Sequence, residues 1–155
     1  MGCEGFLEKS DETVKQFIDL MEEAGANCID LYSPNPDMRS ALGKALAGRR
    51  EKFVLQGHLC TVWKNGQYQR TRKLEEVKAS FQDQLERLGT DHLEIGMIHY
   101  VDSMKDWETG VKNSAVMAYA QELKKAGTIG CIGLSSHNPE VSLAAVNSGL
   151  IDVLM

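Results

Sequence analysis

Two hydrophobic periodicities alternate along the chain. The first is helical, because apolar residues recur every three or four positions after Ser10 or Asp11, either of which can cap a helix, and Gly25 supplies a stop. The second is a short apolar run at 28–32, which predicts a strand and is broken by the proline-rich segment 33–36. The same alternation predicts further helices over 38–46 (capped by Asp37), 74–88, 113–126 and 139–146 (after Asn138), and further strands over 53–59, 93–99, 129–134 and 151–155.

One segment follows a different pattern. Residues 61–64 and 67–70 flank Asn65-Gly66, and an Asn-Gly pair between two strand-like runs is the strongest short signal for a hairpin. We therefore expect a small hairpin in the loop after strand 53–59. Elsewhere, strands alternate with helices of ten or more residues, which predicts βαβ units, a parallel sheet and the α/β class. Nothing resembles a linker, so residues 1–155 are expected to form a single domain.

Composition narrows the function classes. The chain has 17 Lys and Arg against 22 Asp and Glu, a net charge of −5, which argues against nucleic-acid binding because phosphates require a basic face. No apolar run reaches the ~18 residues of a membrane span, and no signal peptide is recognisable, so a cytoplasmic location is expected. The four cysteines form no C-x-x-C pair and are interpreted as buried thiols: Cys3, Cys28, Cys60 and Cys131.

The order of several motifs resembles the aldo-keto reductases. These motifs are Gly25-Ala26-Asn27-Cys28-Ile29-Asp30, Leu42-Gly43-Lys44-Ala45-Leu46, Leu88-Gly89-Thr90-Asp91 with Ile98-His99-Tyr100, and the segment from Gly127 to Ser136. The resemblance implies a (β/α)8 barrel that reduces small-molecule carbonyls with a nicotinamide cofactor. A complete barrel needs about 250 residues, so we expect an incomplete TIM-type barrel of about five to six βα units. These units would extend from a remnant of strand one at 2–6 into strand six. We expect either a homo-oligomer that covers the open sheet edges or disorder at the termini.

The family uses an aspartate, a tyrosine, a lysine and a histidine for catalysis. By resemblance, Asp30 matches the aspartate and His99 the histidine, whereas Asn35 stands where the family has tyrosine and His58 where it has lysine. Tyr32 is the candidate substitute for the proton donor, because residues two apart on a strand face the same side.

The resemblance extends in part to the cofactor site. Ser135 matches the serine that binds the nicotinamide carboxamide, and Ser136 replaces the asparagine that follows it. The implied cofactor is NADP, although the loops after strands seven and eight, which bind phosphate in such barrels, are not in this chain.

Two functions remain open at this point. The first is NAD(P)H-dependent carbonyl or alcohol redox chemistry in the full-length form, with the chain alone expected to be inactive. The second is a non-redox protein on the same fold, either a degenerate binding module or a metal-dependent enzyme, because Glu4, Asp30, His58 and His99 are suitable metal ligands at the ends of four strands. His99 could also be an interior histidine held by Asp30. Finally, an interior His58 facing Asp30 is expected to keep the family's positive charge only below about pH 7.

Overall fold

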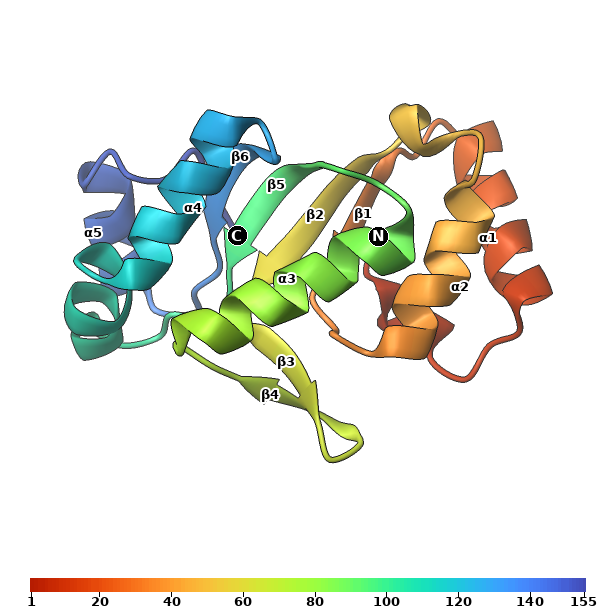
Figure 1. The fold of residues 1–155 in the computed structure, drawn as a ribbon. Coiled ribbons are helices and arrows are strands. Elements are labelled where there is room, and N and C mark those ends of the chain that lie inside the picture. Colours follow the sequence, from red (N-terminus) through yellow and green to blue (C-terminus); the bar gives the residue numbers. More distant parts are fainter.

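A computed structural model describes all residues of the chain, 1–155, as a curved parallel sheet with helices on its outer face. The sheet has five strands in the order β1-β2-β5-β6-β7, and consecutive neighbours are parallel. The strands are β1 (Cys28–Leu31), β2 (Val54–Leu59), β5 (Leu93–Ile98), β6 (Ile129–Leu134) and β7 (Val153–Leu154). The helices are α1 (Asp11–Glu23), α2 (Pro36–Leu46), α3 (Leu74–Leu88), α4 (Ala115–Ala126) and α5 (Pro139–Asn147). This arrangement confirms the α/β class and the partial TIM-type barrel (Figure 1).

Strand register decides which side chains share the inner face of the sheet. Asp30 pairs with Gln56 across β1 and β2, and His58 pairs with Met97 across β2 and β5. Alternate residues of a strand face opposite sides, so Gln56 and His58 lie on the inner face together with Asp30. Gly57, between them, faces outward, since a Cβ atom at this position would point towards α3 and come within 2.8 Å of Gln84 Oε1. The polar residues thus gather inside the curve, while the alternate positions pack against the helices.

The predicted hairpin is present and extends beyond the end of β2 (Figure 1). It consists of β3 (Thr61–Lys64) and β4 (Gln67–Arg70), which pair antiparallel around Asn65-Gly66. Both turn residues have positive φ, 54° and 75°, as the tight two-residue turn requires. Cys60, with a φ of 72°, turns the chain out of β2, and Thr71 N–H donates to the Cys60 carbonyl oxygen at 2.9 Å to close the base.

Several local predictions were wrong. Helix α2 is capped by Asn35 and not by Asp37: the Asn35 side chain accepts from Met38 N–H at 2.9 Å, and Pro36 occupies the first turn. The remnant of strand one is a 3-10 helix, η1 (Cys3–Phe6), preceded by a single bridge between Gly2 and Asp30.

Two further features differ from the sequence analysis. An unpredicted π-helix, η3 (Asp106–Lys112), precedes α4, and a short 3-10 helix, η2 (Arg50–Lys52), precedes β2.

Of the cysteines, Cys3 and Cys60 are buried, whereas Cys28 is exposed at the start of the edge strand β1 and Cys131 is partly exposed. None of the helices has the length and apolar character that crossing a membrane requires.

Candidate active site

A chain of four hydrogen-bonded side chains lies at the carboxyl ends of β1, β2 and β5. His58 Nε2 is 2.8 Å from Asp30 Oδ1, and His58 Nδ1 is 2.8 Å from His99 Nδ1. His99 Nε2 in turn lies 2.6 Å from the hydroxyl of Tyr68 on the hairpin. The structure therefore brings together the three predicted residues Asp30, His58 and His99, and it adds a tyrosine that the sequence analysis did not consider.

Both histidines are enclosed, whereas the carboxylate is partly open to solvent. The side chain of His58 is 1% exposed and that of Asp30 is 25% exposed. Burial, followed by the positive charge of His58, lowers the pKa of His99 to about 3, so this ring is neutral at physiological pH. Burial would raise the pKa of Asp30, but the hydrogen bonds and charge from His58 and the amide of Gln56 outweigh it and lower this pKa. Asp30 is therefore an anion that accepts from His58 Nε2–H.

Tyr32 lies beside the hydrogen-bonded series of Asp30, His58, His99 and Tyr68 but is not part of it. Its ring is stacked on His99 with an interplanar angle of 13°, and it meets the Tyr68 ring edge-on at 6.1 Å between centroids. Burial, then Glu4, raises the pKa of the Tyr32 hydroxyl to about 12. The position is close to the predicted one, but the hydroxyl makes no hydrogen bond to either histidine.

The two serines after β6 differ in how their hydroxyls are used. Ser135 is buried, and its Oγ accepts from Tyr100 N–H at 2.8 Å, which leaves the hydroxyl proton available to a ligand. Ser136 Oγ donates to the Val101 carbonyl oxygen at 2.6 Å, so its proton is already engaged in holding the loop. Tyr100 has a positive φ of 54°, a strained conformation next to His99 of the kind that often marks functional sites.

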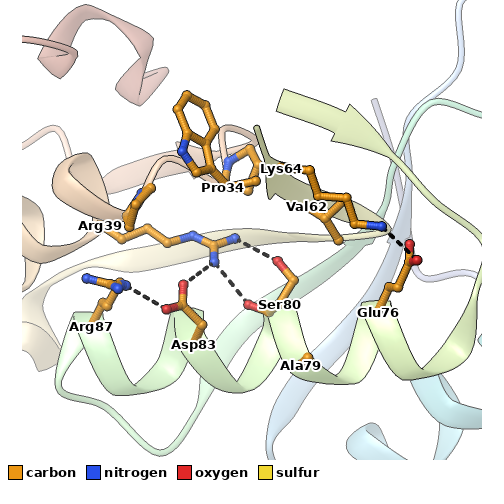
Figure 2. Close-up of a pocket in the computed structure, with 11 residues that line it drawn as sticks. Pro34, Arg39, Val62, Lys64, Glu76, Ala79, Ser80, Asp83 and Arg87 are labelled. Carbon is orange, nitrogen blue, oxygen red and sulfur yellow. Dashed lines mark hydrogen bonds and ion pairs between the residues drawn. The ribbon is translucent and has the colours of Figure 1, made fainter. Parts of the chain in front are cut away.

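One cavity of about 340 Å³ lies beside the hairpin, and another of about 370 Å³ lies at the end of the sheet. Only the second is bordered by Asp30, His58 and His99. The 370 Å³ cavity is lined by Asp30, Tyr32, His58, His99, Tyr100, Ser135, Ser136, His137 and Met155. The other cavity lies between the hairpin, α2 and α3, where Arg39 bonds Ser80 and Asp83, and Lys64 pairs with Glu76 (Figure 2). Its charged side chains are paired with one another, which makes it a junction that supports the hairpin.

The metal-dependent alternative gains no support from the geometry. No group of three or more His, Cys, Asp or Glu side chains is arranged to hold a metal ion. The ring nitrogens of His58 and His99 are already hydrogen-bonded, to each other, to Asp30 and to Tyr68. Glu4 is an exposed residue of η1. The four proposed ligands therefore do not converge.

Comparison with known proteins agrees with this architecture. The sequence profile described as "Aldo/keto reductase family" matches residues 2–155. The chain belongs to the aldo/keto reductase family. Aldo-keto reductase YhdN of Bacillus subtilis (strain 168) is 30% identical over 101 residues, which cover 64% of this chain and 29% of the relative.

Solved structures of aldo/keto reductases share the fold. A putative aldo-keto reductase from Pseudomonas aeruginosa aligns with a TM-score of 0.80 at 27% identity, covering 94% of this chain and 55% of that one. The holo form of aldo-keto reductase AKR11C1 from Bacillus halodurans aligns with a TM-score of 0.79 at 22% identity, covering 100% of this chain and 51% of that one. The chain thus spans about half the length of these solved relatives and less than a third of the curated one.

Tyr68 and Gln56 are the site residues that the sequence analysis missed. Gln56 follows from the strand period, since it lies two residues before His58 on β2. Tyr68 had a weaker signal: the Asn65-Gly66 hairpin begins where β2 ends, which is the active-site end of such barrels. A hairpin at that end can fold back and bring a side chain to the site.

Proposed function

We propose that the full-length protein is an NAD(P)H-dependent oxidoreductase that interconverts small-molecule carbonyls and alcohols. The observation that carries this proposal is the hydrogen-bonded chain from Asp30 through His58 to His99, which borders a 370 Å³ cavity at the carboxyl ends of the strands. Membership of the aldo/keto reductase family supports the same reaction class. Carbonyl reduction needs a hydride donor and an acid beside the carbonyl oxygen, and the cavity borders ionisable groups suited to the second task.

In this proposal the residues of the chain share the work of the family's tetrad. Asp30 is the anion at one end of the hydrogen-bonded series of side chains, and a protonated His58 supplies the positive charge that the family takes from lysine. His99, neutral and bordering the cavity, can pass protons through its two ring nitrogens, which are hydrogen-bonded to His58 and Tyr68. The stacked ring of Tyr32 limits the orientation of His99.

The residues of this chain fit one end of a nicotinamide cofactor. The free hydroxyl proton of Ser135 faces the cavity and can donate to a carboxamide oxygen, whereas the proton of Ser136 is engaged by Val101. When bound, the reduced nicotinamide supplies the hydride. We propose NADP as the cofactor, with its phosphates held by parts of the barrel outside these 155 residues, and for that reason we expect the 155-residue chain alone to be inactive.

The proposal is tested by cofactor binding and hydride transfer in the full-length protein. NADPH should quench tryptophan fluorescence, and NADPH oxidation should appear with at least one member of a panel of aldehydes and ketones. Loss of one hydrogen bond in Ser135→Ala should weaken NADPH binding by about tenfold.

Ser142→Ala on α5 is the matched control, because the Ser142 side chain makes no hydrogen bond in the structure and lies on an outer helix. It should bind NADPH as the wild type does. Absence of hydride transfer from NADPH to any member of the panel in the full-length protein would refute the proposed function, with or without fluorescence quenching.

A further inference from the structure

The position that holds the proton donor in the family is occupied here by a residue with another task. Asn35 cannot act as an acid, and its side-chain oxygen is engaged as the cap of α2 through Met38 N–H. A reduction that proceeds at this site therefore needs an acid from another element. The hydroxyl of Tyr68, on β4 of the hairpin, is the one that reaches the histidine chain, at 2.6 Å from His99 Nε2.

The hairpin that supplies Tyr68 is held at both ends. At its base, Arg72 donates to the carbonyl oxygens of His99 and Tyr100 and pairs with Asp106 at 2.8 Å. Towards its tip, Lys64 forms an ion pair with Glu76 on α3, shown in Figure 2. These contacts tie the hairpin to the loop that carries His99, so the Tyr68 hydroxyl has a defined position.

The hydrogen bonds that link Asp30, His58, His99 and Tyr68 allow two arrangements of protons, which differ by a single proton. In both, Asp30 accepts from His58 Nε2–H. When both rings are neutral, His99 Nδ1–H donates to His58 Nδ1, and Tyr68 O–H donates to His99 Nε2. When His58 carries a second proton, His58 Nδ1–H donates to His99 Nδ1 and His99 Nε2–H donates to the Tyr68 oxygen. Only the second arrangement leaves the Tyr68 O–H free for another acceptor.

We propose that Tyr68 is the catalytic proton donor of this protein, and that His99 and His58 pass it a replacement proton; this rests on the proposed function. In the reducing direction, a bound reduced nicotinamide would supply a hydride to the carbonyl carbon, and the π electron pair would move to the carbonyl oxygen. That oxygen takes the Tyr68 proton, while His99 Nε2–H moves to the Tyr68 oxygen and His58 Nδ1–H moves to His99 Nδ1. The products are an alcohol, the oxidised nicotinamide and a neutral His58, which regains its proton from solvent.

The surrounding charges determine where the extra proton resides. The charged and titratable groups around His58 and His99 are the N-terminal ammonium, Glu4, Asp30, Tyr32, Tyr68, Arg70, Arg72, Tyr100 and His137. Burial, His58 and the arginines of the hairpin segment all lower the pKa of His99, which keeps this ring neutral. Asp30 lies 2.8 Å from His58 Nε2, so the relay begins at the ring that contacts the carboxylate. Because carbonyl reduction consumes a proton and alcohol oxidation releases one, a rise in pH should favour oxidation over reduction.

The kinetic test compares two tyrosines that adjoin the same histidine. Tyr68→Phe in the full-length protein should lower kcat for carbonyl reduction by about 10²- to 10⁴-fold, with a small change in KM, because positioned acids contribute factors of this size. Tyr32→Phe removes a hydroxyl with no bond to the chain and should lower kcat by less than about tenfold.

A second measurement does not depend on activity. In 15N NMR spectra of the histidine rings, Tyr68→Phe should shift the His99 Nε2 resonance, whereas Tyr32→Phe should leave its hydrogen-bonded character unchanged. Retention of the unfolding midpoint in both variants would show that the comparison concerns folded proteins.

The outcomes separate the two proposals. If the wild type reduces carbonyls and Tyr68→Phe retains at least a tenth of kcat, Tyr68 is not the donor, although the proposed function stands. An unchanged His99 Nε2 resonance in Tyr68→Phe would equally overturn the relay. If the wild type binds NADPH but transfers hydride to no carbonyl, the proposed function fails and the role of Tyr68 fails with it.

Discussion

At the scale of single residues, the site consists of a carboxylate, two imidazoles and a phenol, each hydrogen-bonded to the next. His58 is bonded on both ring nitrogens and His99 likewise, so neither ring has a free polar atom inside the fold. A buried polar group without a partner is costly, and removal of any member leaves its neighbour unpaired. The arrangement thus ties the protonation of each residue to that of the next.

The depressed pKa of His99 predicts acid sensitivity of the fold. Because burial and the charge of His58 lower this pKa to about 3, while an unfolded histidine has a pKa of about 6.5, the unfolded chain binds more protons between these values. The free energy of unfolding should therefore fall as the pH drops below about 6.5, by at most about 1.4 kcal/mol per pH unit from this residue. Denaturant titrations between about pH 7 and 4.5, above the carboxylate range, measure this slope.

The variant His99→Gln should reduce that slope, because glutamine does not titrate. The comparison concerns the slope of the free energy of unfolding with pH and not its absolute value, since the substitution also alters hydrogen bonding to His58 and Tyr68. Equal slopes in the variant and the wild type would contradict a neutral His99.

At the scale of elements, close approaches and caps determine how the helices meet the sheet. Helix α2 crosses α3 at Gly43, where a Cβ atom would lie 2.1 Å from the Arg87 carbonyl oxygen. Glycine at this position permits the two helix backbones to touch, which alanine would prevent. The same helix begins at Asn35, whose side chain caps it.

The cap makes a specific prediction for Asn35. Asn35→Ala should lower the free energy of unfolding by about 1 kcal/mol, because Met38 N–H loses its acceptor at the helix terminus. Asn35→Asp, which keeps an acceptor oxygen, serves as the control and should remain close to the wild type. Urea denaturation measures both, and an alanine variant as stable as the wild type would show that the cap is not stabilising.

At the scale of the whole molecule, the curved sheet is open at both sides. Strand β7 pairs only with β6, and Leu154 and Met155 are 43% and 54% exposed. The outer face of α5 is similarly apolar, since Leu143 and Val146 are 63% and 52% exposed. Unpaired edges and apolar faces of this kind are templates for association.

We therefore predict that the 155-residue chain self-associates in solution. Sedimentation at increasing concentration should show dimers or larger species, and Leu154→Lys should shift the distribution towards monomer, because a charge on an edge strand opposes pairing. Gln67→Lys, at the exposed hairpin turn, adds the same charge elsewhere and should have no such effect. A wild-type chain that remains monomeric at all concentrations would contradict this prediction.

The sequence alone determined the elements and their class. Helical spacing, the Ser10 and Asn138 caps and the Asn65-Gly66 turn are local signals, and the structure confirms each of them because local backbone preferences needed no tertiary contact. Motif order also pointed to the aldo/keto reductase family and to an incomplete barrel, both of which are now established.

The tertiary structure decided which side chains meet. Sequence could place Asp30, His58 and His99 at strand ends, but the bond between the two histidines depends on register and curvature, which pair positions far apart in the chain. Asn35-Pro36 carries the same local signal as Asn138-Pro139, although the sequence analysis placed the cap at Asp37. For Tyr68 the only signal was the hairpin that follows β2, which does not specify which of its side chains meets His99. Tyr68 reaches His99 because the hairpin continues from the end of β2 and is tied to the loop that carries His99, by contacts that link residues about thirty positions apart.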